Sequence, residues 1–141
     1  MQCREIMKHK VQLISENETI QAAARKMRDA NVGFLPVVDR EQRVCGTVTD
    51  RDLATRALAE ARPADSPVSA VVSREVVSCN PEDDLSVAES LMISRKKSRV
   101  MCIDTDGRIA GVISLSDIAQ AEGARKAAKT FRGVTQREAH T

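Results

Sequence analysis

The sequence predicts an α/β fold of the α+β type, built from two copies of one β-α-β-β-α unit. The chain of 141 residues matches itself without gaps at an offset of 65 positions, which pairs Gly46 with Gly111 and Asp52 with Asp117. Conservative matches fall at apolar positions, such as Val48 with Ile113. A unit of three strands and two helices buries too little surface to be stable alone. We therefore expect two three-stranded sheets packed face to face about a pseudo-twofold axis, with flanking helices.

Each element of the first copy follows from its local pattern. VQLI at 11–14 predicts a short strand, and the helical spacing of the apolar residues after Thr19 predicts a helix with Thr19 as its N-cap. FLPVVD at 34–39 and RVCGTV at 43–48 predict a β-hairpin. A second helix is expected from Asp50 to about Glu60.

The second copy repeats this order. Asp84 is the expected N-cap of its first helix, and VMCID and RIAGVI form a hairpin whose turn contains Asp106-Gly107. The last helix is expected from Leu115 to about Glu122. These elements predict a first domain at 1–60, a linker at 61–67, a second domain at 68–122, and a basic C-terminal tail at 123–141 that is helical or mobile.

Composition excludes several classes of function. The balance of 22 Lys and Arg against 20 Asp and Glu is unlike a nucleic-acid coat. The N-terminus is charged where a signal peptide would be apolar, and no apolar stretch approaches the length of about 20 residues that crosses a bilayer. We therefore expect a cytoplasmic protein with no membrane partner. The histidines, His9 and His140, lie in no active-site context, so we expect no catalysis by a nucleophile that a histidine activates. The cysteines lack ligand spacing, so we expect reduced, buried thiols and no metal site; they are Cys3, Cys45, Cys79 and Cys102.

The repeated motif GTVTDRDLA at 46–54 and GVISLSDIA at 111–119 is the strongest functional signal. In each copy a strand runs into a helix, whose N-terminal N–H groups and dipole favour an anion such as phosphate. Thr49 and Ser114 place a hydroxyl there, and Asp52 and Asp117 place carboxylates that can accept hydrogen bonds from a ribose diol. The alternative is a capping box, in which the same side chains only satisfy backbone donors.

The two units, with LPVVD at 35–39 and the segments TDRD and SLSD, resemble a tandem pair of CBS (cystathionine-β-synthase) domains, or Bateman module, over about residues 3–122. GVISLSDIAQA is similar to a stretch in the γ subunit of the AMP-activated protein kinase. The resemblance implies a regulatory module that binds adenosine-containing ligands (AMP, ADP or ATP, and in some members NAD or S-adenosylmethionine) in the cleft between the repeats. It would signal to a partner by a conformational shift. The resemblance also implies that the module is not an enzyme and has no catalytic residues.

The resemblance also implies two composite sites, each with residues from both repeats. The first comprises Lys10, Gln12, Val32, Gly33, Phe34, Ser114, Ser116 and Asp117. The second comprises Glu75, Val77, Lys97, Ser98, Arg99, Thr49, Arg51 and Asp52.

The second set carries more positive charge. Arg99 with Arg51 and Lys97 would form a basic mouth suited to a di- or triphosphate, whereas Phe34 stands at the position of Arg99 in the first set. The alternative for Arg99 is a solvated loop. The second repeat departs from the pattern at Met101, which is the counterpart of Pro36. The sequence therefore does not decide whether one or both sites bind a ligand.

We therefore expect no obligatory cofactor, an adenine nucleotide as regulatory ligand, a homodimer formed through the long helices, and a separate effector protein. The rival hypotheses are a scaffold with vestigial pockets and a nucleic-acid-binding module that acts through its basic tail. The two phenylalanines are the only aromatic residues, so stacking platforms for bases are scarce. The basic residues of the tail are Arg125, Lys126, Lys129, Arg132 and Arg137.

Overall fold

The computed structural model of the protein describes residues 1–138, without the side chains of residues 122, 124–127 and 136–138. The chain forms two compact units. The first-repeat unit is Val11–Val76, and the second-repeat unit combines Met1–Lys10 with the chain from Val77 onward. The chain therefore passes from one unit to the other twice. Because residues 1–10 pack with the second repeat, the compact units do not coincide with the sequence repeats.

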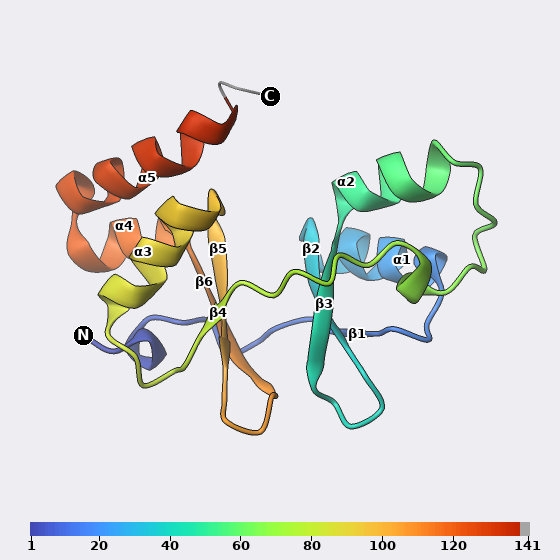
Figure 1. The fold of residues 1–141 in the computed structure, drawn as a ribbon, viewed down its shortest axis with the longest axis horizontal. Coiled ribbons are helices and arrows are strands. Elements are labelled where there is room, and N and C mark those ends of the chain that lie inside the picture. The colour runs from blue at the N-terminus through green and yellow to red at the C-terminus, as the bar shows by residue number, and fades with distance from the viewer. Residues whose placement is uncertain (139–141) are drawn as a thin grey trace. The chain divides into compact units, whose positions relative to one another are not determined.

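The first-repeat unit is a three-stranded mixed sheet with helices, in the predicted β-α-β-β-α order (Figure 1). Strand β1 (Ile14–Ser15) pairs in parallel with β2 (Phe34–Val38), and β2 pairs antiparallel with β3 (Val44–Thr49). Helix α1 (Ile20–Ala30) follows β1. Helix α2 (Asp50–Asp52) follows β3 and continues as a π-helical stretch, η2 (Leu53–Leu58), and a 3-10 turn, η3 (Val68–Ala70), comes later.

The first strand is shorter than the sequence predicts, and Pro36 removes one hydrogen bond that could extend it. The register places Ile14 opposite Val37, so the preceding residues would pair beside Pro36, which has no N–H to donate. The Leu13 carbonyl instead accepts a hydrogen bond from Lys26 Nζ at 2.6 Å. The predicted strand at 11–14 is therefore a strand only at Ile14–Ser15.

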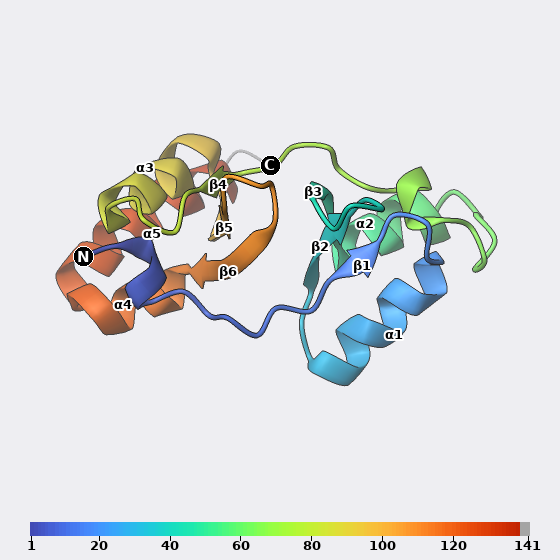
Figure 2. The same ribbon diagram turned by 90° about the horizontal axis from the view of Figure 1, so that it is seen from below.

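The second-repeat unit has the same sheet topology, with β4 (Ser78–Cys79), β5 (Arg99–Ile103) and β6 (Ile109–Ser114) (Figures 1 and 2). Its helices are α3 (Leu85–Arg95), α4 (Leu115–Glu122) and α5 (Ala124–Glu138), and a 3-10 turn, η1 (Cys3–Glu5), comes from the N-terminus. Met101 stands where the first repeat has Pro36, and its N–H donates to the Val77 carbonyl at 3.1 Å.

Helix α5 belongs to the second-repeat unit, where it packs on α3 and α4. Val134 joins the apolar core of this unit, and Thr130 is fully buried. The basic C-terminal segment is therefore a structural helix as far as Glu138. Among the described residues, no helix has the length and apolar character needed to cross a membrane.

Helix caps and hairpin turns account for several of the repeated polar residues. Thr19 accepts a hydrogen bond from the Ala22 N–H at 3.0 Å, which confirms it as the N-cap of α1. Asp84 caps α3, and its hydrogen bonds to Ser86 lower the pKa of this carboxyl to about 2. Asp39 and Asp104 each accept from two backbone N–H groups of their own hairpin turn, at 2.9 and 3.0 Å in both cases.

In each unit, a segment from outside the three strands pairs with the edge strand next to the repeated glycine. Lys8 exchanges two backbone hydrogen bonds with Val112, at 2.9 and 3.1 Å, beside Gly111. Ser73 does the same with Thr47, at 2.9 Å in both directions, beside Gly46. A Cβ on Gly111 would lie 2.8 Å from the Lys8 carbonyl oxygen, and a Cβ on Gly46 would meet the Ser73 carbonyl. The two glycines are therefore needed for close backbone approach.

Substitution of Gly111 tests this crossing. Gly111→Ala should lower the free energy of unfolding by about 1–3 kcal/mol, because the methyl group overpacks a backbone contact that cannot yield easily. Urea denaturation monitored by circular dichroism measures the loss. Gln120→Ala, on the exposed face of α4, is the control and should stay within about 0.5 kcal/mol of wild type. Equal stability of both variants would contradict the close approach.

Candidate functional site

The two strand-to-helix junctions have the same hydrogen-bonded geometry. At the first, Asp52 N–H donates to Thr49 Oγ1 at 3.1 Å and Thr49 N–H donates to Asp52 Oδ2 at 2.9 Å. At the second, Asp117 N–H donates to Ser114 Oγ at 3.2 Å and Ser114 N–H donates to Asp117 Oδ2 at 2.8 Å. Both predicted motifs therefore form capping boxes, the alternative that the sequence left open.

The capping boxes use only one oxygen of each aspartate. The other oxygen of Asp117 lies 3.8 Å from Lys8 Nζ, and the other oxygen of Asp52 lies 4.0 Å from an Arg56 guanidinium nitrogen. A carboxylate offers about four lone-pair sites. Capping therefore does not exhaust the acceptor capacity of either aspartate.

The two junctions differ in their surroundings. Asp117 is 8% exposed and has the Lys8 ammonium group beside it, whereas Asp52 is 19% exposed. Ser116 Oγ lies 2.9 Å from Ser114 Oγ, so two hydroxyl groups stand together at the start of α4. The second junction thus combines a carboxylate, two hydroxyls and a cation within one unit.

Each junction lies beside the start of the central strand of its own sheet. Phe34 is opposite Thr49, and the Asp50 N–H donates to the Gly33 carbonyl at 3.0 Å. In the second-repeat unit, Arg99 is opposite Ser114. The Leu115 N–H likewise donates to the Ser98 carbonyl at 2.9 Å. Around each junction, the structure therefore places side by side residues that the prediction assigned to different sets.

The predicted composite sets each draw on both compact units. In the first set, the second-repeat unit holds Lys10, Ser114, Ser116 and Asp117, and the first-repeat unit holds Gln12, Val32, Gly33 and Phe34. In the second set, the first-repeat unit holds Thr49, Arg51, Asp52 and Glu75, and the second-repeat unit holds Val77, Lys97, Ser98 and Arg99. The combination of residues across the units stays a prediction.

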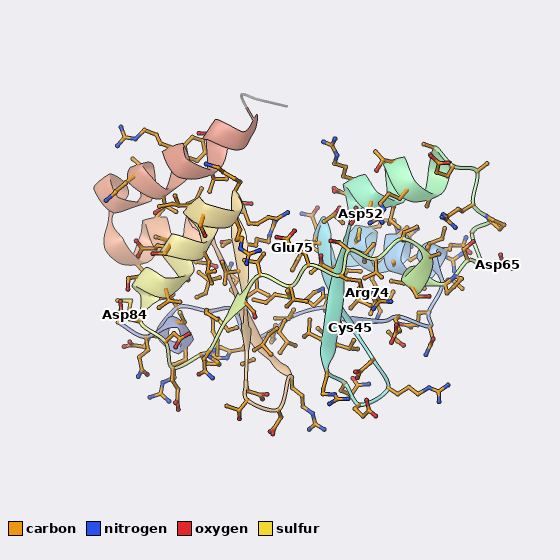
Figure 3. All side chains as sticks on the ribbon, in the orientation of Figure 1. Cys45, Asp52, Asp65, Arg74, Glu75 and Asp84 are labelled. Carbon is orange, nitrogen blue, oxygen red and sulfur yellow. The ribbon has the colours of Figure 1, made fainter. Side chains whose placement is uncertain are left out.

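Sequence reasoning missed Lys8, which the strand-like crossing brings to Asp117. At the repeat offset its counterpart is Ser73, so the first junction has no lysine at this place. The next residue, Arg74, donates hydrogen bonds to the Cys45 carbonyl and to a Glu16 carboxylate oxygen, both at 3.4 Å (Figure 3). These contacts hold the segment along β3. Glu75 follows directly and therefore lies in the same compact unit as Asp52. No local pattern around residue 8 indicates the crossing, because it depends on pairing with a strand far along the chain.

The thiols in the second-repeat unit are shielded from solvent. Burial raises the pKa of Cys3 to about 12, and a hydrogen bond with Cys102, together with burial, raises the pKa of Cys79. Burial also raises the pKa of Cys45 in the first-repeat unit. The thiols of Cys3, Cys45 and Cys79 are therefore protonated at neutral pH and poor nucleophiles. All four cysteines are free, as expected, but Cys45 is only half-buried, whereas Cys3, Cys79 and Cys102 are buried.

Comparison with known proteins finds one family. The sequence profile of the CBS domain matches residues 3–59 and 68–124. The CBS domain-containing protein YhcV of Bacillus subtilis is 41% identical over 117 residues, which cover 82% of this chain and 81% of YhcV.

Two solved structures have the same fold. The structure of Hypoxic Response Protein I with two coordinated zinc ions is 26% identical, with a TM-score of 0.76 over 86% of this chain and 98% of that one. The CBS domain protein PAE2072 from Pyrobaculum aerophilum, complexed with AMP, is 21% identical, with a TM-score of 0.76 over 94% of this chain and 99% of that one.

The role of Asp117 as a cap can be measured without any ligand. Asp117→Ala should lower the free energy of unfolding by about 1 kcal/mol, because the Ser114 N–H loses its acceptor. Asp117→Asn should lose less, because its amide oxygen can replace Oδ2. Urea unfolding at neutral pH distinguishes the two variants. Wild-type stability of Asp117→Ala would show that the capping box does not form in solution.

Proposed function

Because the chain belongs to the CBS domain family, we propose that it is a regulatory module that binds an adenosine-containing ligand and is not itself an enzyme. The observation that carries the proposal is the paired junction: in both repeats a hydroxyl and a carboxylate begin a helix, and one carboxylate oxygen is left over from the cap. That oxygen is an acceptor for a ribose hydroxyl. The helix N-terminus and the neighbouring hydroxyl suit a phosphate.

The second junction supports this proposal best. Asp117 can keep its hydrogen bond to Ser114 N–H while its other oxygen accepts from a ribose. Lys8, 75% exposed and 3.8 Å from that oxygen, can turn toward a phosphate instead. The complex of PAE2072 with AMP gives a ligand of this class in a protein of the same fold.

At the first junction, basic residues would bind the phosphate of the ligand. Arg51 is exposed on the first turn of α2. Arg99 and Lys97, from the second predicted set, would add charge for a di- or triphosphate. We propose that this set prefers more phosphate than the set around Asp117.

The output of binding belongs to the same proposal. A ligand shifts a conformational equilibrium only by its difference in affinity for the two states. We propose that the ligand-bound state is recognised by a separate effector protein, and that the chain acts as a homodimer.

A thermal-shift panel with AMP, ADP, ATP, NAD and S-adenosylmethionine tests binding. A ligand at 100 times its Kd stabilises the folded state by about 2.7 kcal/mol, which raises the midpoint by roughly 5–10 °C for a chain of this size. Asp117→Asn or Asp52→Asn should abolish the shift for the ligand of its own set, because the amide nitrogen replaces an acceptor with a donor while the cap remains. Asp50→Asn removes a charge from the same turn as Asp52 and is the matched control, with the full shift expected.

Three outcomes of this panel decide the proposal. A shift that survives both Asp52→Asn and Asp117→Asn would place the ligand elsewhere. A shift that Asp50→Asn also abolishes would indicate loss of charge alone. No shift with any of the five ligands would favour the scaffold hypothesis.

The nucleic-acid hypothesis has its own test on helix α5, where Lys129 and Arg132 are exposed. Deletion of this helix would remove Val134 from the core, so side-chain substitution is the cleaner experiment. Fluorescence anisotropy with a labelled single-stranded oligonucleotide should show no salt-sensitive binding. Binding lost in the Lys129→Ala/Arg132→Ala double variant but kept in Asp52→Asn and Asp117→Asn would favour the rival hypothesis.

A further inference from the structure

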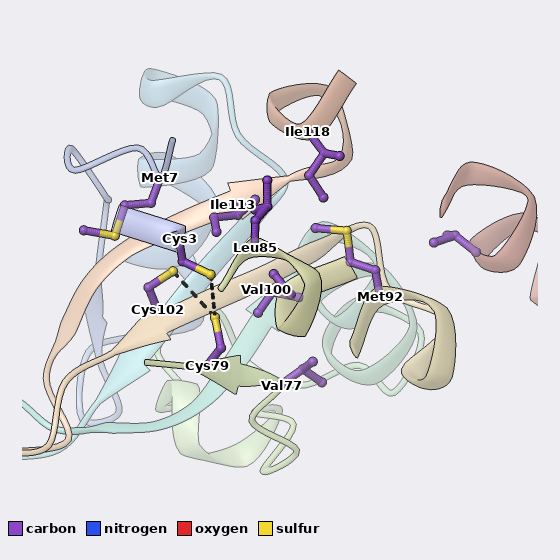
Figure 4. Packing of buried hydrophobic residues seen from close by; sticks show 12 residues of the cluster. Cys3, Met7, Val77, Cys79, Leu85, Met92, Val100, Cys102, Ile113 and Ile118 are labelled. Carbon is purple, nitrogen blue, oxygen red and sulfur yellow. Dashed lines mark hydrogen bonds between the residues drawn. The ribbon is translucent and has the colours of Figure 1, made fainter. Parts of the chain in front are cut away.

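Three cysteines from separate parts of the chain meet in the core of the second-repeat unit (Figure 4). Cys3 comes from η1, Cys79 from β4 and Cys102 from β5. The Cys79 sulfur lies 3.6 Å from that of Cys3 and 3.9 Å from that of Cys102, and all three sulfurs lie within 4.8 Å of one another. All three residues are buried, and none is in a disulfide. We call this group the cysteine cluster.

The packing of the fold does not require sulfur at these positions. At the repeat offset of 65, the counterparts of Cys3, Cys79 and Cys102 are Val68, Ile14 and Val37. These three aliphatic residues are buried in the core of the first-repeat unit. Ile14 pairs with Val37 across the strands just as Cys79 pairs with Cys102. The same backbone arrangement therefore accommodates two sets of core side chains, aliphatic residues in the first-repeat unit and cysteines in the second.

Two of the three sulfur separations are close to those around a metal ion. Metal–thiolate bonds of about 2.3 Å hold two sulfurs about 3.8 Å apart in tetrahedral geometry and about 4.0 Å apart in trigonal geometry. The separations of 3.6 and 3.9 Å are close to these values. A disulfide would bring two sulfurs to about 2.05 Å, which would leave the third cysteine without a partner sulfur.

We propose that the cysteine cluster binds one thiophilic metal ion, three-coordinate through its thiolates, for which copper(I) is the best match. Soft thiolate ligands select copper(I). Zinc in a structural site takes four ligands. Among the described residues, the group that could hold a metal here consists of three cysteines with no histidine or carboxylate as a fourth. Each cysteine binds as a thiolate, and its proton passes to solvent when the ion enters.

The N-terminal segment provides the entry path. Cys3 lies in a short 3-10 turn whose backbone is fastened by hydrogen bonds from Cys3 N–H to the Asp83 carbonyl and from Arg4 N–H to the Pro81 carbonyl, at 2.9 and 2.8 Å. Opening of these hydrogen bonds would move Cys3 away and give an ion access to the sulfurs of Cys79 and Cys102. Metal binding would then fasten the N-terminal segment to both strands.

Anaerobic titration of the reduced protein with copper(I), in competition with a chromophoric copper(I) chelator, tests the proposal. Wild type should bind one ion per chain, and X-ray absorption should report three sulfur neighbours at about 2.3 Å. Variants that copy the first repeat, Cys3→Val, Cys79→Ile and Cys102→Val, should each weaken binding by more than about 100-fold, since loss of an outer-shell partner alone costs about 10- to 100-fold.

The controls separate loss of a ligand from loss of the fold. Cys45 is the one cysteine outside the cluster, and its counterpart in the second repeat is Ala110, so Cys45→Ala should bind copper(I) like wild type. Circular dichroism of each metal-free variant checks that the core tolerates the aliphatic residue. Copper(I) binding that survives all three cluster substitutions would overturn the proposal.

Zinc ions, titrated in parallel, decide the identity of the ion. Zinc binding at the cluster without copper(I) binding would overturn the three-coordinate assignment. If wild type binds neither ion, the cysteines serve only as small apolar residues. Because the panel of adenosine ligands is measured without metal, failure of that panel leaves the titration unaffected, and the reverse also holds.

Discussion

The constraint on which the structure depends is the pairing of each edge strand with a segment from the other end of its unit. Lys8 pairs with Val112, and Ser73 pairs with Thr47. Both crossings need a glycine on the edge strand, because a Cβ there would strike the crossing backbone. One glycine per repeat thus allows a segment that lies outside the β-α-β-β-α unit to complete its sheet edge. The N-terminal crossing brings two features into the second-repeat unit, the Lys8 cation beside Asp117 and the Cys3 thiol beside Cys79.

Much of the fold could be predicted because its determinants are local and appear twice. The caps at Thr19 and Asp84 and the hairpin turns at Asp39 and Asp104 depend on hydrogen bonds within a few residues, so short patterns reveal them. The first strand was predicted too long because its length depends on pairing with β2, which lies about twenty residues further along the chain. The predicted β-α-β-β-α order holds in both units because the apolar pattern of the repeats encodes it.

The site could be predicted only in part for the same reason. The hydroxyl and the aspartate of each junction are three residues apart and were found from the motif, together with the alternative that they form a cap. Lys8 was missed because its position depends on pairing with Val112, about a hundred residues away in sequence. The cysteine cluster was missed because linear spacing was the criterion, whereas its members come from three separate elements. Comparison of the repeats contains the missing signal, since each clustered cysteine replaces an aliphatic residue at the offset of 65.

The two units share a backbone and differ in chemistry at matched positions. Where the first repeat has Ile14, Val37 and Val68, the second has thiols, and where the first has Ser73, the second has Lys8. A backbone held by glycine crossings, caps and hairpin turns tolerates such changes, because these constraints do not involve the side chains that differ. In the second-repeat unit, the distinctive side chains lie in the core and at the strand-to-helix junction. The N-terminal segment contributes to both, through Cys3 in η1 and through Lys8 beside Asp117. A change that loosened this segment would therefore alter the position of Lys8 and of Cys3 together.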